Sequence, residues 1–119
     1  MLEKIIELTN EYIESMPKKE RKKYGQFFTS METARFMSGL YNIDEQKSKV
    51  SVLDAGAGSG ILSCAFIERL EMIDSIQKIE LTCYENDNNV LPLLKQNLDY
   101  CKEKSGKKID INIIEDNYI

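Results

Sequence analysis

Glycines and carboxylates are the residues of this sequence whose types and spacing could do chemistry. The stretch LDAGAGSG, residues 53–60, follows a short apolar run, and Asp54 begins its polar part. Glycine lacks a Cβ atom and accepts positive φ angles, so a loop with three glycines can bring its backbone against a ligand. Glu85 and Asp116 each follow a later apolar segment. The alternative interpretation is a tight turn that holds no ligand, accompanied by exposed loop acids.

The spacing of these residues favours an adenosine cofactor without a phosphate. Glu85 lies 25 residues after Gly60, at a position from which an acid can accept hydrogen bonds from the hydroxyls of a ribose. A dinucleotide loop of the form GxGxxG would need its third glycine where this sequence has Ile61. Asp54, at the root of the loop, would repel a pyrophosphate and attract the ammonium and sulfonium groups of S-adenosylmethionine. We therefore expect S-adenosylmethionine as the cofactor.

Alternating strands and helices must position these residues. Short apolar or alternating runs predict strands over residues 50–54, 79–85 and 108–116, with helical periodicity in the intervals between them. This order is typical of parallel strands joined by right-handed crossovers. The predicted fold class is therefore α/β, a partial Rossmann-like sheet of three parallel strands in the order 3-2-1, with helices on both faces. Ligands of such sheets bind at the carboxyl ends of the strands, which is where the three acids fall.

Further helices are predicted from apolar spacing and capping residues. Residues 2–16 place apolar side chains three and four positions apart, as an amphipathic helix does. Ser30 is a suitable N-cap for a second helix, which the pattern carries to about Tyr41. Asn88 or Asn89 could cap the helix that follows the second strand.

The run KKERKK, residues 18–23, carries five basic side chains in six positions. It is either a solvated helix end or loop, or a patch that contacts phosphate groups. The pattern alone leaves both interpretations open.

Length and composition indicate one small globular domain or a piece of a larger one. The chain has 119 residues, a formal net charge of −4 and 42% apolar residues. It has no histidine and three widely spaced cysteines, so we expect neither a metal site nor a disulfide framework; Cys64 and Cys83 fall in apolar segments, as core residues do. The sequence shows no signal peptide and no membrane-spanning run, so we expect a cytoplasmic protein with no membrane partner.

Four stretches of sequence extend from about Lys22 to the last residue: YGQFFTSMETARFM, VSVLDAGAGSGILSCAFIERL, YENDNNVLPLLKQNL and INIIEDNYI. Together they resemble the cofactor region of adenine-N6 DNA methyltransferases of restriction–modification systems. DAGAGSG alone indicates only some kind of methyltransferase, whereas GQFFT ahead of it is much more specific. The resemblance implies the S-adenosylmethionine methyltransferase fold, with the cofactor region placed before the catalytic region, and DNA as the partner of the full-length protein.

The resemblance also implies which residues contact the cofactor. The segment that folds over its methionine end would comprise Gln26, Phe27, Phe28 and Thr29. For the two phenylalanines, plain core packing is the alternative. The loop beneath the cofactor would comprise Asp54, Ala55, Gly56, Ala57, Gly58 and Gly60.

The acids after the second and third strands would contact the adenosine part. By the resemblance, Glu85 and Asn86 would hold the ribose and flank the adenine. Asp116 would accept a hydrogen bond from the adenine amino group, with Asn117 beside it. Neither a catalytic nor a metal-binding residue is expected in this chain.

The sequence departs from the family pattern at two points. Ser30 replaces the proline that usually follows the threonine, which is a small change. The family holds its flipped target adenine with a short Asn/Asp-Pro-Pro-aromatic motif after the fourth strand, and this sequence has no Pro-Pro. We therefore expect residues 1–119 to be a single domain, an N-terminal fragment of a methyltransferase that is inactive alone. Within it, residues 1–49 would form the N-terminal helices and the segment that covers the cofactor, and residues 50–119 would form the β-α-β-α-β half. The alternatives are a methyltransferase for RNA, protein or a small molecule, or a non-catalytic nucleotide-binding module.

The predicted strand order leaves one edge of the sheet without a partner. Residues 50–54 would expose an apolar edge because a fourth strand is missing beside them, and proteins normally hide such edges. We expect the chain to associate with itself through this edge or through the adjoining helices.

Overall fold

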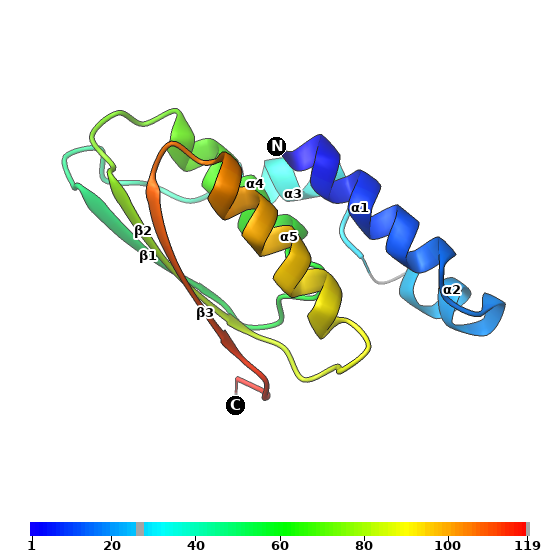
Figure 1. The fold of residues 1–119 in the computed structure, drawn as a ribbon. Coiled ribbons are helices and arrows are strands. Elements are labelled where there is room, and N and C mark those ends of the chain that lie inside the picture. The colour runs from blue at the N-terminus through cyan, green and yellow to red at the C-terminus, as the bar shows by residue number, and fades with distance from the viewer. Residues whose placement is uncertain (26–27, 119) are drawn as a thin grey trace.

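A parallel sheet packed against helices makes up the described part of the chain, residues 1–25 and 28–118, in this computed structural model (Figure 1). The elements in chain order are α1 (Leu2–Glu14), α2 (Lys18–Gly25), α3 (Met31–Gly39), β1 (Lys49–Asp54), α4 (Ile61–Glu71), β2 (Lys78–Tyr84), α5 (Leu91–Lys104) and β3 (Lys108–Ile114). The predicted alternation of strands and helices in the second half of the chain is confirmed.

The three strands are parallel and lie in the order β1-β2-β3, which confirms the predicted order. In the register of the sheet, Val50 of β1 is beside Ile79 of β2, and Ile79 is beside Ile109 of β3. Because the strands are parallel and aligned, their carboxyl ends meet at one edge of the sheet. The chain segments that follow β1, β2 and β3 therefore start close together.

The helices cover one face of the sheet, so the expectation of helices on both faces is wrong. Figure 1 shows α1, α4 and α5 on the same side of the three strands. Along β2, the side chains of Ile79, Leu81 and Cys83 are buried, whereas the residues that alternate with them are only half-buried. The two crossovers step in the same direction across the sheet, from β1 to β2 and from β2 to β3. Right-handed connections that step in one direction place both helices on one face.

The core lies between that face and the helices. Leu70 of α4 and Leu94 and Leu98 of α5 are fully buried, in one cluster with Ile79 and Leu81 of the sheet. Burying each such side chain stabilises the fold by roughly 1.5–3 kcal/mol. This packing fixes where α4 and α5 begin, and therefore fixes the loops that precede them.

The three cysteines are buried free thiols, which confirms the prediction that Cys64 and Cys83 are core residues. The Sγ atoms of Cys64 and Cys101 lie 2.7 Å apart, between α4 and α5. The hydrogen bond from Cys101, together with burial, raises the pKa of the Cys64 thiol well above its usual range. The Cys64 thiol is therefore protonated at neutral pH.

The structure confirms one predicted helix cap and corrects another. The hydroxyl of Ser30 accepts a hydrogen bond from the backbone N–H of Thr33, as expected of an N-cap, although α3 ends at Gly39 and does not reach Tyr41. Neither Asn88 nor Asn89 caps α5.

The turn before α5 is organised by Asp87 instead. Its carboxylate accepts from the backbone N–H of Asn89 at 2.9 Å, and its backbone carbonyl accepts from the N–H groups of Val90 and Leu91. Asp87 thus occupies the N–H groups that a side chain at position 88 or 89 would have to satisfy. As a result α5 begins at Leu91, one or two residues later than a cap at Asn89 or Asn88 would place it.

Candidate functional site

The loop between β1 and α4 brings the predicted glycines to the carboxyl edge of the sheet. Gly58 and Gly60 have φ angles of +56° and +85°, a left-handed conformation that other residues rarely adopt. Gly60 is the N-cap of α4, and its N–H donates to the carbonyl of Ala57 at 2.8 Å. The N–H of Ala57 donates in turn to the carbonyl of Tyr84, the last residue of β2. The loop is therefore attached to the end of the neighbouring strand.

Glu85 connects the glycine loop to the segment after β2. One carboxylate oxygen accepts from the N–H of Gly58 at 2.7 Å, and the other accepts from the N–H groups of Asn86 and Asp87 at 3.1 and 3.0 Å. A carboxylate has about four acceptor positions, so three backbone donors leave it able to accept one further hydrogen bond. Glu85 is half-buried. This arrangement gives the predicted ribose acceptor a fixed orientation beside the glycine loop.

Phe28 lies against the glycine loop. A Cβ atom built on Gly58 would meet the Phe28 ring at 3.7 Å. On its other side, Phe28 stacks on Tyr24, with ring centroids 6.1 Å apart. The hydroxyl of Tyr24 donates to the carboxylate of Asp87 at 2.7 Å. The segment before α3 is thereby joined to the loop that carries Glu85.

The hydrogen bond between Tyr24 and Asp87 also changes the acidity of the phenol. Donation to a carboxylate favours the protonated form, so the Asp87 carboxylate raises the pKa of Tyr24. Tyr24 is therefore a neutral hydrogen-bond donor throughout the physiological pH range.

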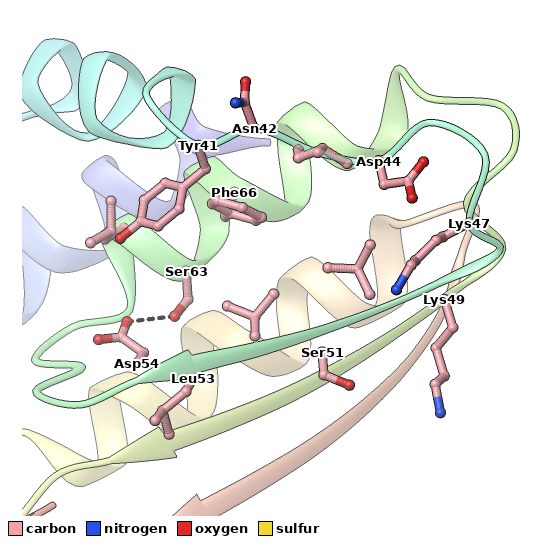
Figure 2. Close-up of a pocket in the computed structure, with 14 residues that line it drawn as sticks. Tyr41, Asn42, Asp44, Lys47, Lys49, Ser51, Leu53, Asp54, Ser63 and Phe66 are labelled. Carbon is pink, nitrogen blue, oxygen red and sulfur yellow. Dashed lines mark hydrogen bonds between the residues drawn. The ribbon is translucent and has the colours of Figure 1, made fainter.

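Asp54 ends β1 and lines a cleft to which Glu85 does not contribute. Its carboxylate accepts from the Ser63 hydroxyl of α4 at 2.6 Å, as Figure 2 shows. Both residues line a cleft of about 410 Å³ along the free side of β1. In the same cleft, the rings of Tyr41 and Phe66 pack edge to face, with their centroids 5.3 Å apart. This cleft does not include Glu85 or the glycines.

The remaining predicted residues vary in how close they lie to Glu85. The carbonyl of Ile114, at the end of β3, accepts from the N–H of Glu85 at 3.0 Å, so the chain passes Glu85 immediately before Asp116. The side chains of Asp116 and Asn117 are exposed, as is that of Asn86. Thr29 lines a second hollow of about 490 Å³ between α1 and α3, together with Phe28. Two predicted residues, Gln26 and Phe27, lie outside the described residues.

The loop residues also differ in exposure. Ala55 and Gly56 are exposed, whereas Ala57 is buried beneath them. A Cβ atom on Gly56 would meet no other atom within 4 Å, so the chain at this point faces open space. The exposed backbone over residues 55 and 56 is the part of the loop that a ligand could approach.

The charges at the carboxyl edge suit a cationic ligand without phosphate. Within the described part of the chain, Asp54, Glu85 and Asp116 form no ion pair with a lysine or arginine. A pyrophosphate placed against these three carboxylates would be repelled, because no cation is paired with any of them in the described residues. These three carboxylates therefore fit S-adenosylmethionine, because their oxygens can accept hydrogen bonds from its hydroxyl and amino groups and attract its positive charges.

Four residues that connect the site were missed by sequence reasoning. They are Tyr24, Ser63, Asp87 and Asn97. The amide of Asn97 in α5, which is fully buried, donates to the carbonyl of Ser59 in the glycine loop at 2.8 Å and to the Thr9 hydroxyl of α1 at 3.2 Å. A polar residue in the middle of an apolar helical face was the available signal for Asn97, because buried polar groups usually have a specific partner. Tyr24 bonds to Asp87, 63 residues away in the sequence, and Ser63 bonds to Asp54, 9 residues away. Partners this far apart leave no local pattern in the sequence.

Across residues 1–25 and 28–118, no group of three or more histidine, cysteine, aspartate or glutamate side chains is arranged to hold a metal ion. The helices in these ranges are also too short or too polar to cross a membrane.

Comparisons with known proteins agree with the sequence resemblance. A sequence model of the family described as N-6 DNA Methylase matches residues 6–117. The chain is 36% identical over 101 residues to the Type II methyltransferase M.BsuBI of Bacillus subtilis, an alignment that covers 85% of this chain and 19% of that protein. It is 33% identical over 103 residues to the Type II methyltransferase M.PstI of Providencia stuartii, covering 83% of this chain and 20% of that protein. The chain thus spans about a fifth of the length of these relatives. No solved structure matches it significantly.

Proposed function

Because this chain belongs to the N-6 DNA methylase family, we propose that its strand ends bind S-adenosylmethionine as the cofactor region of an adenine-N6 DNA methyltransferase of a restriction–modification system. The observation that carries the proposal is the position of Glu85. Its carboxylate bonds to the glycine loop through Gly58 and keeps an acceptor position free, with no cation paired to it in the described residues. Bound S-adenosylmethionine would supply the methyl group.

Each part of the site has a proposed role toward the cofactor. Glu85 holds the ribose by accepting from one of its hydroxyls, and Asn86 flanks the adenine. Asp116, with Asn117 beside it, accepts from the adenine amino group. The loop of residues 54–60 lies under the methionine part, where the charge of Asp54 favours the ammonium and sulfonium groups.

The segment of residues 26–29 is proposed to cover the methionine end. The contact of Phe28 with Gly58 supports this, because it places an aromatic ring over the glycine loop. We accordingly propose that residues 1–49 are the helices and covering segment of a single domain, and residues 50–119 the half that carries the strands.

Methyl transfer is proposed for the whole protein that includes this chain. The family's Pro-Pro motif is absent from these 119 residues, so the chain alone is expected to bind cofactor and transfer nothing. The test is to supply the whole protein with S-adenosylmethionine carrying a labelled methyl group, together with duplex DNA, and to identify the product by mass spectrometry of the digested nucleosides. N6-methyladenine is the expected product. Label found instead in RNA, protein or a small molecule would replace DNA adenine as the substrate.

The free side of β1 is a proposed contact between two copies of the chain. In the described residues β1 pairs only with β2, and its Leu53 side chain is 50% exposed. Tyr41, which lines the cleft on the helix side of β1, is 58% exposed (Figure 2). An unpaired edge next to exposed apolar side chains favours strand addition. Light scattering during size-exclusion chromatography should show a mass that rises with concentration, whereas a monomer at every concentration would contradict this proposal.

A further inference from the structure

The basic run of residues 18–23 forms most of α2, and almost none of it is used by the fold. Tyr24 is the one buried residue of α2. The five cationic side chains, Lys18, Lys19, Arg21, Lys22 and Lys23, are all exposed. In the described part of the chain none of them forms an ion pair, and the ammonium of Lys23 lies 5.3 Å from the centroid of the Tyr24 ring. Packing and ion pairing therefore do not account for this concentration of charge.

The charge of α2 is opposite to that of the rest of the chain. Its five cations and one acid, Glu20, give α2 a net charge of +4, whereas the whole chain carries −4, so the remaining residues carry −8. An extended polyanion would be repelled by most of this molecule and attracted at α2. A contact with such a partner would be confined to this helix.

The fold fixes α2 beside the proposed site. Tyr24, near the end of the helix, donates to Asp87 at 2.7 Å and stacks on Phe28, and Phe28 in turn lies against Gly58. Figure 1 shows α2 at the end of the molecule where the strands finish and the loop before α5 lies. A partner bound along α2 would therefore be held next to Glu85 and the glycine loop.

We propose that α2 is a DNA-contacting surface whose lysine and arginine side chains bind the phosphate backbone. This inference rests on the proposed function for the identity of the polyanion. A membrane surface is less suitable, because interfacial helices need a broad apolar face and α2 has only the buried Tyr24. With a rise of 1.5 Å per residue, the eight residues of α2 extend about 12 Å, enough to reach about two or three phosphates of one strand.

The test compares two variants of equal charge change in their binding to a fluorescent DNA duplex at several salt concentrations. One carries Lys18→Gln, Arg21→Gln and Lys22→Gln on α2. The control carries Lys102→Gln, Lys104→Gln and Lys108→Gln, at the far end of α5 and the start of β3 (Figure 1). The α2 variant should reduce the slope of log Kobs against log salt by about 2 to 3. The control should keep the slope of the unchanged chain.

The proposal would be overturned if the unchanged chain did not bind DNA at low salt, if the α2 variant kept the slope of the unchanged chain, or if both variants changed the slope equally. A parallel measurement with vesicles of phosphatidylglycerol separates the sources of phosphate. Loss of vesicle binding with intact DNA binding in the α2 variant would also contradict it. Calorimetry with S-adenosylmethionine should give the same affinity for all three chains, so failure of the cofactor proposal would be seen separately from failure of the DNA contact.

Discussion

Replacing Glu85 with alanine should weaken the binding of S-adenosylmethionine by about 10- to 100-fold. Hydrogen bonds to a charged group are each worth about 1.5–3 kcal/mol, and every 1.4 kcal/mol is a factor of ten in affinity. The variant removes the proposed acceptor of a ribose hydroxyl and also frees the N–H of Gly58 from its present partner. Titration calorimetry of the unchanged chain and the variant measures the ratio directly.

Two further variants separate ligand contact from loss of structure. Glu103→Ala removes an exposed carboxylate at the end of α5 and should leave the affinity unchanged. Glu85→Gln keeps the length of the side chain and one acceptor oxygen, so its affinity should lie between those of the alanine variant and the unchanged chain. If Glu85→Ala is folded by circular dichroism and binds the cofactor as tightly as the unchanged chain does, Glu85 is not the ribose acceptor.

Replacing Gly60 with alanine should lower the free energy of unfolding by about 2 to 4 kcal/mol. A left-handed conformation costs a non-glycine residue roughly 1–2 kcal/mol, and overpacking of a core typically costs about 1–3 kcal/mol. Gly60 has φ of +85°, and its added Cβ would lie 3.0 Å from the Cδ1 atom of Leu94, which is fully buried and cannot easily move. Urea denaturation of both proteins gives the difference.

The other loop glycines supply a graded control. Gly56→Ala should change stability by about 0.5 kcal/mol or less, because the new Cβ meets nothing within 4 Å and no positive φ is required. Gly58→Ala should lose about 1–2 kcal/mol, since its φ is +56° but its nearest neighbour is an ordinary 3.7 Å away. Equal losses at all three positions would show that loop composition, and not the conformation at Gly60, determines stability.

Features set by local chemistry could be predicted from the sequence. The sequence LDAGAGSG between an apolar run and a helical pattern was sufficient to predict a strand, a turn and a helix, because Gly58 and Gly60 supply the positive φ angles that the turn needs. Ser30 was predicted as an N-cap because its hydroxyl is a suitable acceptor just ahead of a helical pattern, and it accepts from Thr33. The order of the strands followed from assigning the alternating elements to half of a doubly wound sheet, in which the first three strands lie in the order 3-2-1.

Features set by distant contacts could not be predicted. Asp87, and not Asn88 or Asn89, organises the start of α5. One of its carboxylate oxygens and its backbone carbonyl accept from N–H groups of the turn. Its other carboxylate oxygen accepts from Tyr24, which lies 63 residues earlier in the sequence. The sequence suggested that the Asp54 carboxylate is open to a ligand beside the glycines. Instead it accepts from the Ser63 hydroxyl, a contact that depends on how α4 packs on β1. The expectation of helices on both faces overlooked that two crossovers stepping in one direction must share a face.

The most direct test of the cofactor assignment is calorimetric titration of the 119-residue chain with S-adenosylmethionine and, in parallel, with NAD. The carboxylates of Asp54, Glu85 and Asp116 predict saturable binding of one S-adenosylmethionine per chain and no measurable heat from NAD at the same concentrations. Preferential binding of NAD, or no binding of S-adenosylmethionine by the folded chain, would contradict the assignment.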